Sequence, residues 1–180
     1  MTESDAPRRV FFALWPEGVT LDALDAAAHL GVARCGGRRM RRDSLHMTLL
    51  FIGAAGPAEL ERLCGVADGV RLAPFAMTLD RFGYWPHNRI LWAGSHAAPS
   101  CQRRLFTTLA DGLAAAGFRL ESRPCEPHVT LARHARCAGL PELAQPIDWR
   151  VEEFALIESF LQPSGARYRT LQRWPLREST

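Results

Sequence analysis

Two short stretches decide how this chain is interpreted: Ser44-Leu45-His46-Met47-Thr48-Leu49 and Pro127-His128-Val129-Thr130-Leu131-Ala132-Arg133. Each contains the pattern His-x-Thr-Leu within a short apolar run, which is typical of a β-strand. From residue frequencies, a chain of this length should contain on the order of a few hundredths of such a match. Chance therefore does not explain two copies, and the repeated pattern marks a candidate functional site.

On a β-strand, residues i and i+2 point to the same face of the sheet. Each motif therefore presents an imidazole and a hydroxyl side by side, His46 with Thr48 and His128 with Thr130, while the residues between them face the core. One imidazole can remove a proton from an attacking hydroxyl or water, and the other can protonate the leaving oxygen. Threonine hydroxyls can donate hydrogen bonds to phosphate oxygens, where charge accumulates. We expect phosphoryl chemistry without a metal or other cofactor.

The rest of the chain alternates between strand and helix patterns. Apolar alternation or short apolar runs predict strands at 10–14, 45–52, 75–79, 89–93, 129–132, 154–160 and 168–174. Apolar residues at helical spacing predict helices at 21–32, 57–69 and 100–117, and 83–88 is expected as a loop. Each half runs strand, helix and motif strand, which indicates a weak internal duplication. No low-complexity linker separates the halves, so we expect a single domain, 1–180, of two intertwined lobes.

The paired motifs resemble those of the 2H phosphoesterase superfamily, most closely its RNA 2′,3′-cyclic phosphodiesterase (2′-5′ RNA ligase) family. The resemblance covers nearly the whole chain and is carried by both motifs and by Arg9-Val10-Phe11-Phe12-Ala13-Leu14-Trp15-Pro16, Phe82-Gly83-Tyr84-Trp85-Pro86 and Gly165-Ala166-Arg167-Tyr168. It implies an α+β, bilobal, pseudo-duplicated fold with antiparallel sheets lining a central groove and helices outside.

The same resemblance implies an activity and residue roles. The activity is hydrolysis of RNA 2′,3′-cyclic phosphate ends to 2′-phosphates, with reversible 2′-5′ RNA ligation. His46 is implied to be the proton donor and His128 the proton acceptor. Arg133, in the tail of the second motif, is implied to clamp a phosphate, which suits the fork of a guanidinium. The simpler alternative for Arg133 is a surface arginine at a strand end.

Two further groups of residues are candidates for contact with RNA. An arginine cluster precedes the first motif and could track a nucleic-acid backbone: Arg38, Arg39, Arg41 and Arg42. Four aromatic residues could stack on bases: Phe11, Trp85, Trp92 and Tyr168. Most aromatic residues of a globular protein lie in the core, and most exposed arginines are merely solvated, so neither group is assigned a role from the sequence.

Composition restricts the class of protein. The formal net charge of +3 is a weaker basic bias than dedicated DNA-binding domains show. The five cysteines are scattered without a C-x-x-C pair, so we expect neither a disulfide framework nor a zinc ribbon, and a reducing cytoplasm fits best. No apolar run approaches the ~18–20 residues that span a bilayer, and we expect a cytoplasmic monomer with no membrane partner.

Several rival functions are weighed against this interpretation. A zinc hydrolase would carry a ligand set such as H-E-x-x-H, and a base deaminase would carry H-x-E with P-C-x-x-C; neither pattern occurs. A non-catalytic RNA-end-binding module would keep the groove and its arginines but would not need both histidines. A 2H phosphoesterase for another nucleotide cyclic phosphate would keep the same chemistry. The last two alternatives stay open at this stage.

Overall fold

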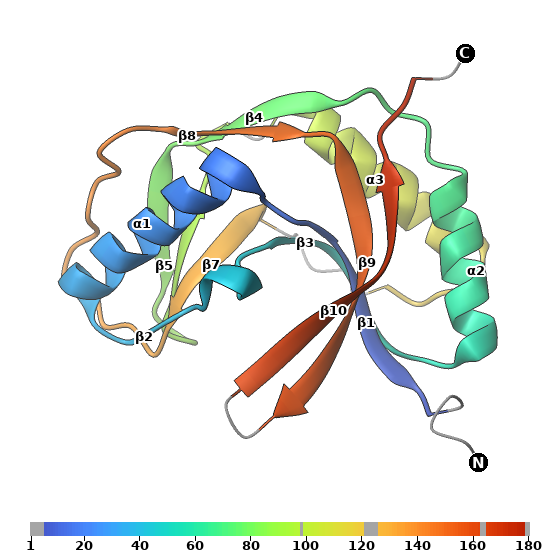
Figure 1. The fold of residues 1–180 in the computed structure, drawn as a ribbon, viewed down its shortest axis with the longest axis horizontal. Coiled ribbons are helices and arrows are strands. Elements are labelled where there is room, and N and C mark those ends of the chain that lie inside the picture. Colours follow the sequence, from blue (N-terminus) through green and yellow to red (C-terminus); the bar gives the residue numbers. More distant parts are fainter. Residues whose placement is uncertain (1–5, 98, 121–125, 163–164, 179–180) are drawn as a thin grey trace.

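The computed structural model describes residues 6–97, 99–120, 126–162 and 165–178 (Figure 1). The helices in these ranges are α1 (Gly18–Cys35), α2 (Pro57–Asp68), α3 (Ser100–Ala115) and the short 3-10 helix η1 (Arg42–Ser44). The strands are β1 (Arg8–Leu14), β2 (Arg38–Arg39), β3 (Met47–Ala55), β4 (Phe75–Leu79), β5 (Arg81–Trp85), β6 (Ile90–Gly94), β7 (His128–Arg133), β8 (Ile147–Val151), β9 (Glu153–Gln162) and β10 (Gly165–Pro175).

One long antiparallel sheet runs through both halves of the chain. Its strand order is β10-β9-β1-β3-β7-β6-β5, with β2 paired to β7 off this path, while β4 and β8 form a separate two-stranded sheet. The halves meet where β3 pairs with β7, and the only pairing between these two described strands is Met47 opposite Val129. The two motif strands therefore form the junction between the lobes.

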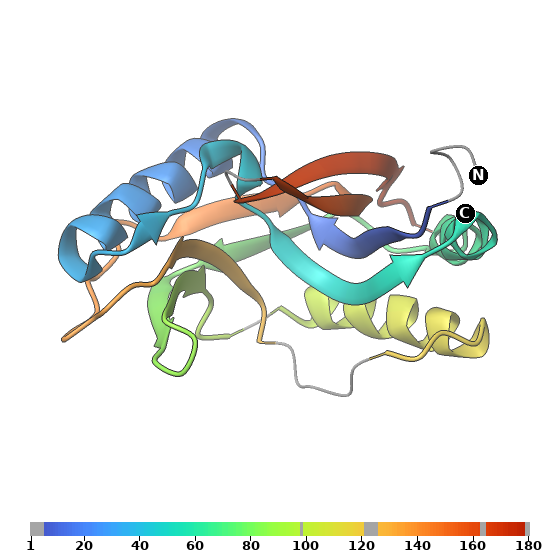
Figure 2. The same cartoon turned by 90° about the horizontal axis from the view of Figure 1, so that it is seen from below.

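The helices and the last hairpin intertwine the two halves. Helix α1 belongs to the N-terminal half but packs against β6, β7 and β8, whereas α2 and α3 pack on each other and on β3. Figure 2 shows α1 and the α2–α3 pair at opposite ends of the molecule. The C-terminal strand β9 pairs with β1 from the other end of the chain. The expected bilobal α+β architecture is confirmed.

The core contains the motif residues that were expected to face inward. Met47, Leu49, Val129 and Leu131 are each at most 3% exposed. Full burial of such a side chain contributes roughly 1.5–3 kcal/mol. The same apolar positions that hold the lobes together therefore fix the orientation of the polar residues between them.

The expectation of a loop at 83–88 was wrong for residues 83–85, which belong to β5 and pair with β6, and correct for 86–88, which lie in a turn. Gly83 had been taken as a loop residue, but it lies opposite Trp92 in the pairing of these strands. A Cβ at Gly83 would lie 2.0 Å from Cζ2 of Trp92, so the glycine makes room for the indole. The strand β8, with alternating burial, was also not predicted.

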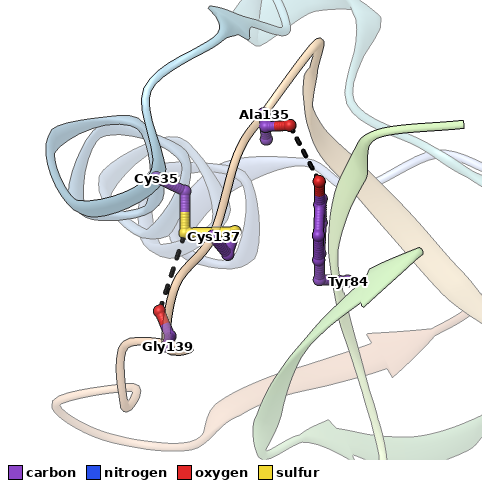
Figure 3. The surroundings of a disulfide bond; sticks show 5 residues. All are labelled: Cys35, Tyr84, Ala135, Cys137 and Gly139. Carbon is purple, nitrogen blue, oxygen red and sulfur yellow. Dashed lines mark hydrogen bonds between the residues drawn. A yellow bond between two sulfur atoms is a disulfide. The ribbon is translucent and has the colours of Figure 1, made fainter. Parts of the chain in front are cut away.

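The expectation that the chain lacks disulfides was also wrong. Cys35, the last residue of α1, is bonded to Cys137 in the segment after β7, with their Cα atoms 4.4 Å apart (Figure 3). The two residues are 102 positions apart in the sequence, so their spacing gave no signal of proximity. Nearby, the Tyr84 hydroxyl donates a hydrogen bond to the Ala135 carbonyl at 3.0 Å (Figure 3). Of the other cysteines, Cys64 and Cys101 are free, and Cys125 lies outside the described residues.

Candidate active site

The two motifs face each other across the junction between β3 and β7. Because Met47 lies opposite Val129 in an antiparallel pair, extending the register by one residue each way brings His46 opposite Thr130 and Thr48 opposite His128. Side chains of directly opposed residues share one face of the sheet, with Cβ atoms about 4.5–5.5 Å apart. The pairing of Met47 with Val129 therefore brings both imidazoles and both hydroxyls to one face of the junction.

A groove of about 450 Å³ lies over this junction. It is lined by residues of both lobes: Arg9, Phe11, Met40, His46, Thr48, Phe51, Ile90, His128, Thr130, Arg133, Ser159, Leu161, Ala166 and Tyr168. All five candidate site residues from the sequence are among them, so the structure brings the candidate residues of both motifs together. The sequence did not single out Phe51, Met40, Ser159, Leu161 or Ala166, because their positions depend on how the strands pair.

A bulge in β7 explains how Arg133 reaches the groove. Trp92 pairs with Thr130, while the preceding residue, Leu91, pairs with Ala132. Leu131 is therefore an extra residue on β7, which is a β-bulge. A bulge reverses the alternation of side chains beyond it, so a residue three positions after the threonine can share the threonine's face.

The first motif contains the same device. Thr48 and Leu50 pair with consecutive residues of β1, which makes Leu49 the extra residue on β3. The leucine of each His-x-Thr-Leu motif is thus the bulge, and the third residue after each threonine lines the groove. That residue is Phe51 in one motif and Arg133 in the other.

The same backbone contact orients both imidazoles. Nδ1 of His46 lies 2.8 Å from the carbonyl oxygen of Ser44, and Nδ1 of His128 lies 2.7 Å from that of Glu126. A carbonyl oxygen only accepts hydrogen bonds, so Nδ1 carries the hydrogen in each ring. In the neutral ring, Nε2 is then the basic atom that takes up or releases a proton.

Aromatic rings surround His46. Its ring is stacked on Trp15 with centroids 4.9 Å apart, and Tyr168 and Phe11 approach with centroids at 5.0 and 5.1 Å. This burial lowers the pKa of His46 from 6.5 to about 4, although the hydrogen bond to the Ser44 carbonyl acts in the opposite direction. In the empty groove His46 is therefore neutral at neutral pH.

His128 has a different environment. Trp85 and Trp92 meet its ring edge-on with centroids 4.5 and 6.1 Å away. Burial lowers the pKa of His128, whereas the carbonyl and the carboxylate of Glu126 raise it. The four aromatics considered for base stacking thus all contact one of the histidine rings.

Glu126, whose carbonyl oxygen accepts the hydrogen bond from Nδ1 of His128, contacts a side chain of β5. The carboxylate of Glu126 forms an ion pair with Arg81, whose guanidinium lies 5.1 Å above the ring of Trp92. The indole of Trp92 packs directly on the backbone of Gly83 and Gly94. A Cβ at these positions would lie 2.0 and 2.6 Å from it. This set was missed, because nothing in the sequence connects these residues to the second motif.

The arginine cluster before the first motif is mostly neutralised by aspartates. Three of its members form ion pairs: Arg39 with Asp25, Arg41 with Asp43 and Arg42 with Asp22. Arg38 forms no ion pair within the described part of the chain. Within the described residues, Arg38 is therefore the member of this cluster that is left unpaired for contact with RNA.

Two searches of the described residues bear on the class of protein. No three His, Cys, Asp or Glu side chains in these ranges are grouped closely enough to hold a metal ion. No helix in the same ranges is long and apolar enough to cross a membrane.

A family model described as LigT like phosphoesterase matches residues 14–92 and 98–168. The chain belongs to the LigT-like phosphoesterase family. Each matched segment contains one His-x-Thr-Leu motif, so the expected duplication is confirmed. The expected phosphoesterase class is confirmed as well.

Named members of the LigT-like family are similar over nearly the whole chain. The RNA 2′,3′-cyclic phosphodiesterase of Escherichia coli is 31% identical, over 94% of this chain and 97% of the relative. The enzyme of the same name from Thermus thermophilus is 33% identical, over 94% and 90%. The crystal structure of E. coli LigT complexed with 3′-AMP matches with a TM-score of 0.85 and 30% identity, over 94% of this chain and 98% of that chain.

Proposed function

We propose that this chain hydrolyses RNA 2′,3′-cyclic phosphate ends to 2′-phosphates without a metal. The observation that carries this proposal is the opposed pair of histidines in one groove, each with its Nδ1 hydrogen committed to a carbonyl. Such a pair can deliver one proton and accept another within a single displacement. The printed names of the relatives, and the 3′-AMP complex of one of them, support the same substrate class.

In this mechanism His46 protonates the departing 3′ oxygen and His128 removes a proton from water. The Glu126 carboxylate supports His128 as acceptor, because a nearby negative charge stabilises the imidazolium that forms. The low pKa of His46 makes its protonated form a strong acid. The negative charge of a bound phosphate would raise the pKa of His46, because it stabilises the imidazolium.

The threonines and Arg133 act on the phosphate. Thr48 and Thr130 each lie beside the opposite histidine and donate hydrogen bonds to the non-bridging oxygens, where charge develops. Arg133 lines the same groove, and its charge reaches both histidines, where it lowers their pKa values. A phosphate bound there would neutralise this effect while the guanidinium holds it.

The test is incubation of the protein with a panel of 2′,3′-cyclic mononucleotides and oligoribonucleotides, followed by phosphorus NMR of the products. The expected product is a 2′-phosphate. A product that is mainly 3′-phosphate would mean that the groove holds the ring in the opposite orientation. Binding without turnover would favour a non-catalytic RNA-end-binding module. Turnover confined to a cyclic phosphate other than an RNA end would favour a 2H phosphoesterase that acts on another nucleotide cyclic phosphate.

The same groups can open the ring with a different nucleophile. If a 5′-hydroxyl takes the place of water, it loses its proton to His128, the bond from phosphorus to the 3′ oxygen breaks, His46 protonates that oxygen, and a 2′-5′ linkage forms. Water is the usual competitor, so we propose slight 2′-5′ RNA ligation at high RNA concentration. Gel analysis of products resistant to a 3′-5′-specific nuclease would detect it.

We also propose that residues 1–180 act as a single domain of two intertwined lobes, as a monomer in the cytoplasm. The continuous sheet and the packing of α1 on strands of the other half support a single unit. One cooperative unfolding transition and a monomer mass by light scattering are the expected results. The intracellular location follows from the proposed RNA substrate, and fractionation of cells would test it.

A further inference from the structure

Two arginines oppose each other at one end of the groove. Strand β2 pairs with β7 so that Arg38 lies directly opposite Arg133. Directly opposed residues of antiparallel strands project from the same face of the sheet, and like charges in this arrangement are destabilising. Neither arginine has an ion-pair partner among the residues that the structure describes. Within the described residues, two positive charges therefore lie side by side with no acidic partner.

The neighbours of Arg38 show that the chain neutralises arginines elsewhere in the same segment. Arg39, Arg41 and Arg42 are each paired with an aspartate. The unpaired position is the one that lies opposite Arg133. This contrast indicates that the compensating charge for Arg38 comes from a bound anion.

Arg38 also approaches the start of β10. A Cβ at Gly165, the first residue of β10, would lie 3.2 Å from Nη1 of Arg38. The next residue of β10, Ala166, lines the groove. Met40, two residues after Arg38, also lines it. The guanidinium of Arg38 therefore lies at the groove end, between strand β2 and the β9–β10 hairpin.

This end of the groove is separated from the histidines. Arg133 is five residues along β7 from His128, and at ~3.3 Å per residue the two Cα atoms are up to about 16 Å apart. The charge of Arg133 lowers the pKa of both histidines, and Arg38, unlike Arg133, does not line the groove. Arg133 therefore extends toward the reaction centre and Arg38 lies farther out.

We infer that Arg38, opposite Arg133, binds a second phosphate: the internucleotide phosphate on the 5′ side of the terminal nucleotide. This inference rests on the proposed function, and it names the substrate class as oligoribonucleotides in preference to mononucleotides. A guanidinium fork suits a bridging phosphodiester, because it can donate two parallel hydrogen bonds to the two non-bridging oxygens.

The experiment compares kcat/KM for a 2′,3′-cyclic mononucleotide with kcat/KM for a trinucleotide that ends in the same cyclic residue. Wild-type protein should prefer the trinucleotide, and Arg38→Gln should lower the trinucleotide-to-mononucleotide ratio about tenfold, the scale of one partly exposed charged hydrogen bond. Arg38→Lys should lose less. The matched control is Arg42→Gln, which removes an arginine already paired with Asp22 and should keep the ratio.

Two further readouts separate a phosphate site from a structural role. Arg38→Gln should melt at the same or a higher temperature without RNA, because it removes a like-charge repulsion. It should also reduce the salt dependence of trinucleotide binding by roughly one phosphate contact, a slope change of ~0.7. An unchanged ratio, or an equal loss on both substrates with a lower melting temperature, overturns the inference. Absence of turnover by the wild-type protein overturns the proposed function, and the inference falls with it.

Discussion

The imidazole of His46 is stacked on the indole of Trp15, with 4.9 Å between the ring centroids and 5° between the ring planes. The face of an aromatic ring attracts a cation, which by itself would favour the imidazolium. The loss of water around the ring has the larger effect, because the pKa of His46 falls to about 4. In the free enzyme, Nε2 of this proposed proton donor therefore carries no proton at neutral pH.

We expect phosphate binding to restore that proton. In NMR titrations of the imidazole signals, His46 should titrate near pH 4 in the empty protein and at a clearly higher pH with 3′-AMP. A His46 signal that titrates near 6.5 without ligand would contradict the burial argument.

The same shift has a kinetic counterpart. Both histidine pKa values are lowered in the free enzyme, and kcat/KM reports free-enzyme pKa values, so its bell-shaped profile should lie on the acidic side of pH 6.5. The profile of kcat, which reports the complex, should lie at higher pH. The two limbs belong to the coupled pair and do not identify which histidine is which. Profiles of kcat and kcat/KM with the same optimum would argue against a ligand-induced rise.

Removal of either imidazole should abolish most turnover. His46→Ala and His128→Ala should each reduce kcat by ~10²–10⁴-fold, the typical contribution of one proton-transfer group. Circular dichroism and thermal melts should show a folded protein in both cases. A folded variant that keeps nearly wild-type turnover would rule out the two-histidine mechanism.

Glu126→Gln should change the pH dependence more than substrate binding. Its carboxylate raises the pKa of His128, so the neutral amide should lower that pKa and shift the kcat/KM profile to lower pH. KM should change little, because Glu126 does not line the groove. The matched control is Glu152→Gln, which breaks a surface pair with Arg150 and should leave the profile in place.

Chelation should leave activity intact. The proposed mechanism routes both protons through imidazoles, so exhaustive treatment with EDTA is expected to change the rate by less than the assay error. The comparison is a parallel sample to which EDTA and excess Mg²⁺ are both added. Activity that disappears with the chelator and returns only with a divalent ion would revive a metal-dependent mechanism.

Reduction should destabilise the protein without removing the site. The Cys35–Cys137 bond closes a loop of about 100 residues, and a disulfide typically stabilises a protein by about 2–4 kcal/mol. Denaturant melts with and without dithiothreitol should differ by this amount. Cys137→Ser should behave like the reduced protein, and Cys64→Ser should still respond to reduction. Equal stability of the oxidised and reduced protein would show that the bond contributes nothing.

The sequence was informative where a residue's role depends on local periodicity. The inward positions Met47, Leu49, Val129 and Leu131 followed from alternation, and the identity of the motifs followed from their repetition. Long-range pairings left no such pattern. The disulfide joins residues far apart in the chain, and the support of Glu126 by Arg81 depends on the packing of β5 against the loop before β7.

The β-bulges also depend on strand pairing that the sequence does not reveal. Simple alternation would have turned Arg133 away from Thr130, and only the family resemblance suggested a role for it. Whether a leucine continues a strand or forms a bulge depends on the partner strand, as the pairings of Leu49 and Leu131 show. The extra residue Leu131 in β7 therefore determines that the Arg133 side chain lines the groove.

The matched bulges also have a stereochemical consequence. A groove with two identical halves would be indifferent to a half-turn of its guest, and a five-membered cyclic phosphate could enter with either ribose oxygen toward either imidazole. Phe51 and Arg133 occupy equivalent places but differ in shape and charge, so the two entry modes are no longer equal in energy. The proposed regiochemistry of ring opening would then depend on Phe51 and Arg133 as well as on the unlike aromatic surroundings of the two histidines.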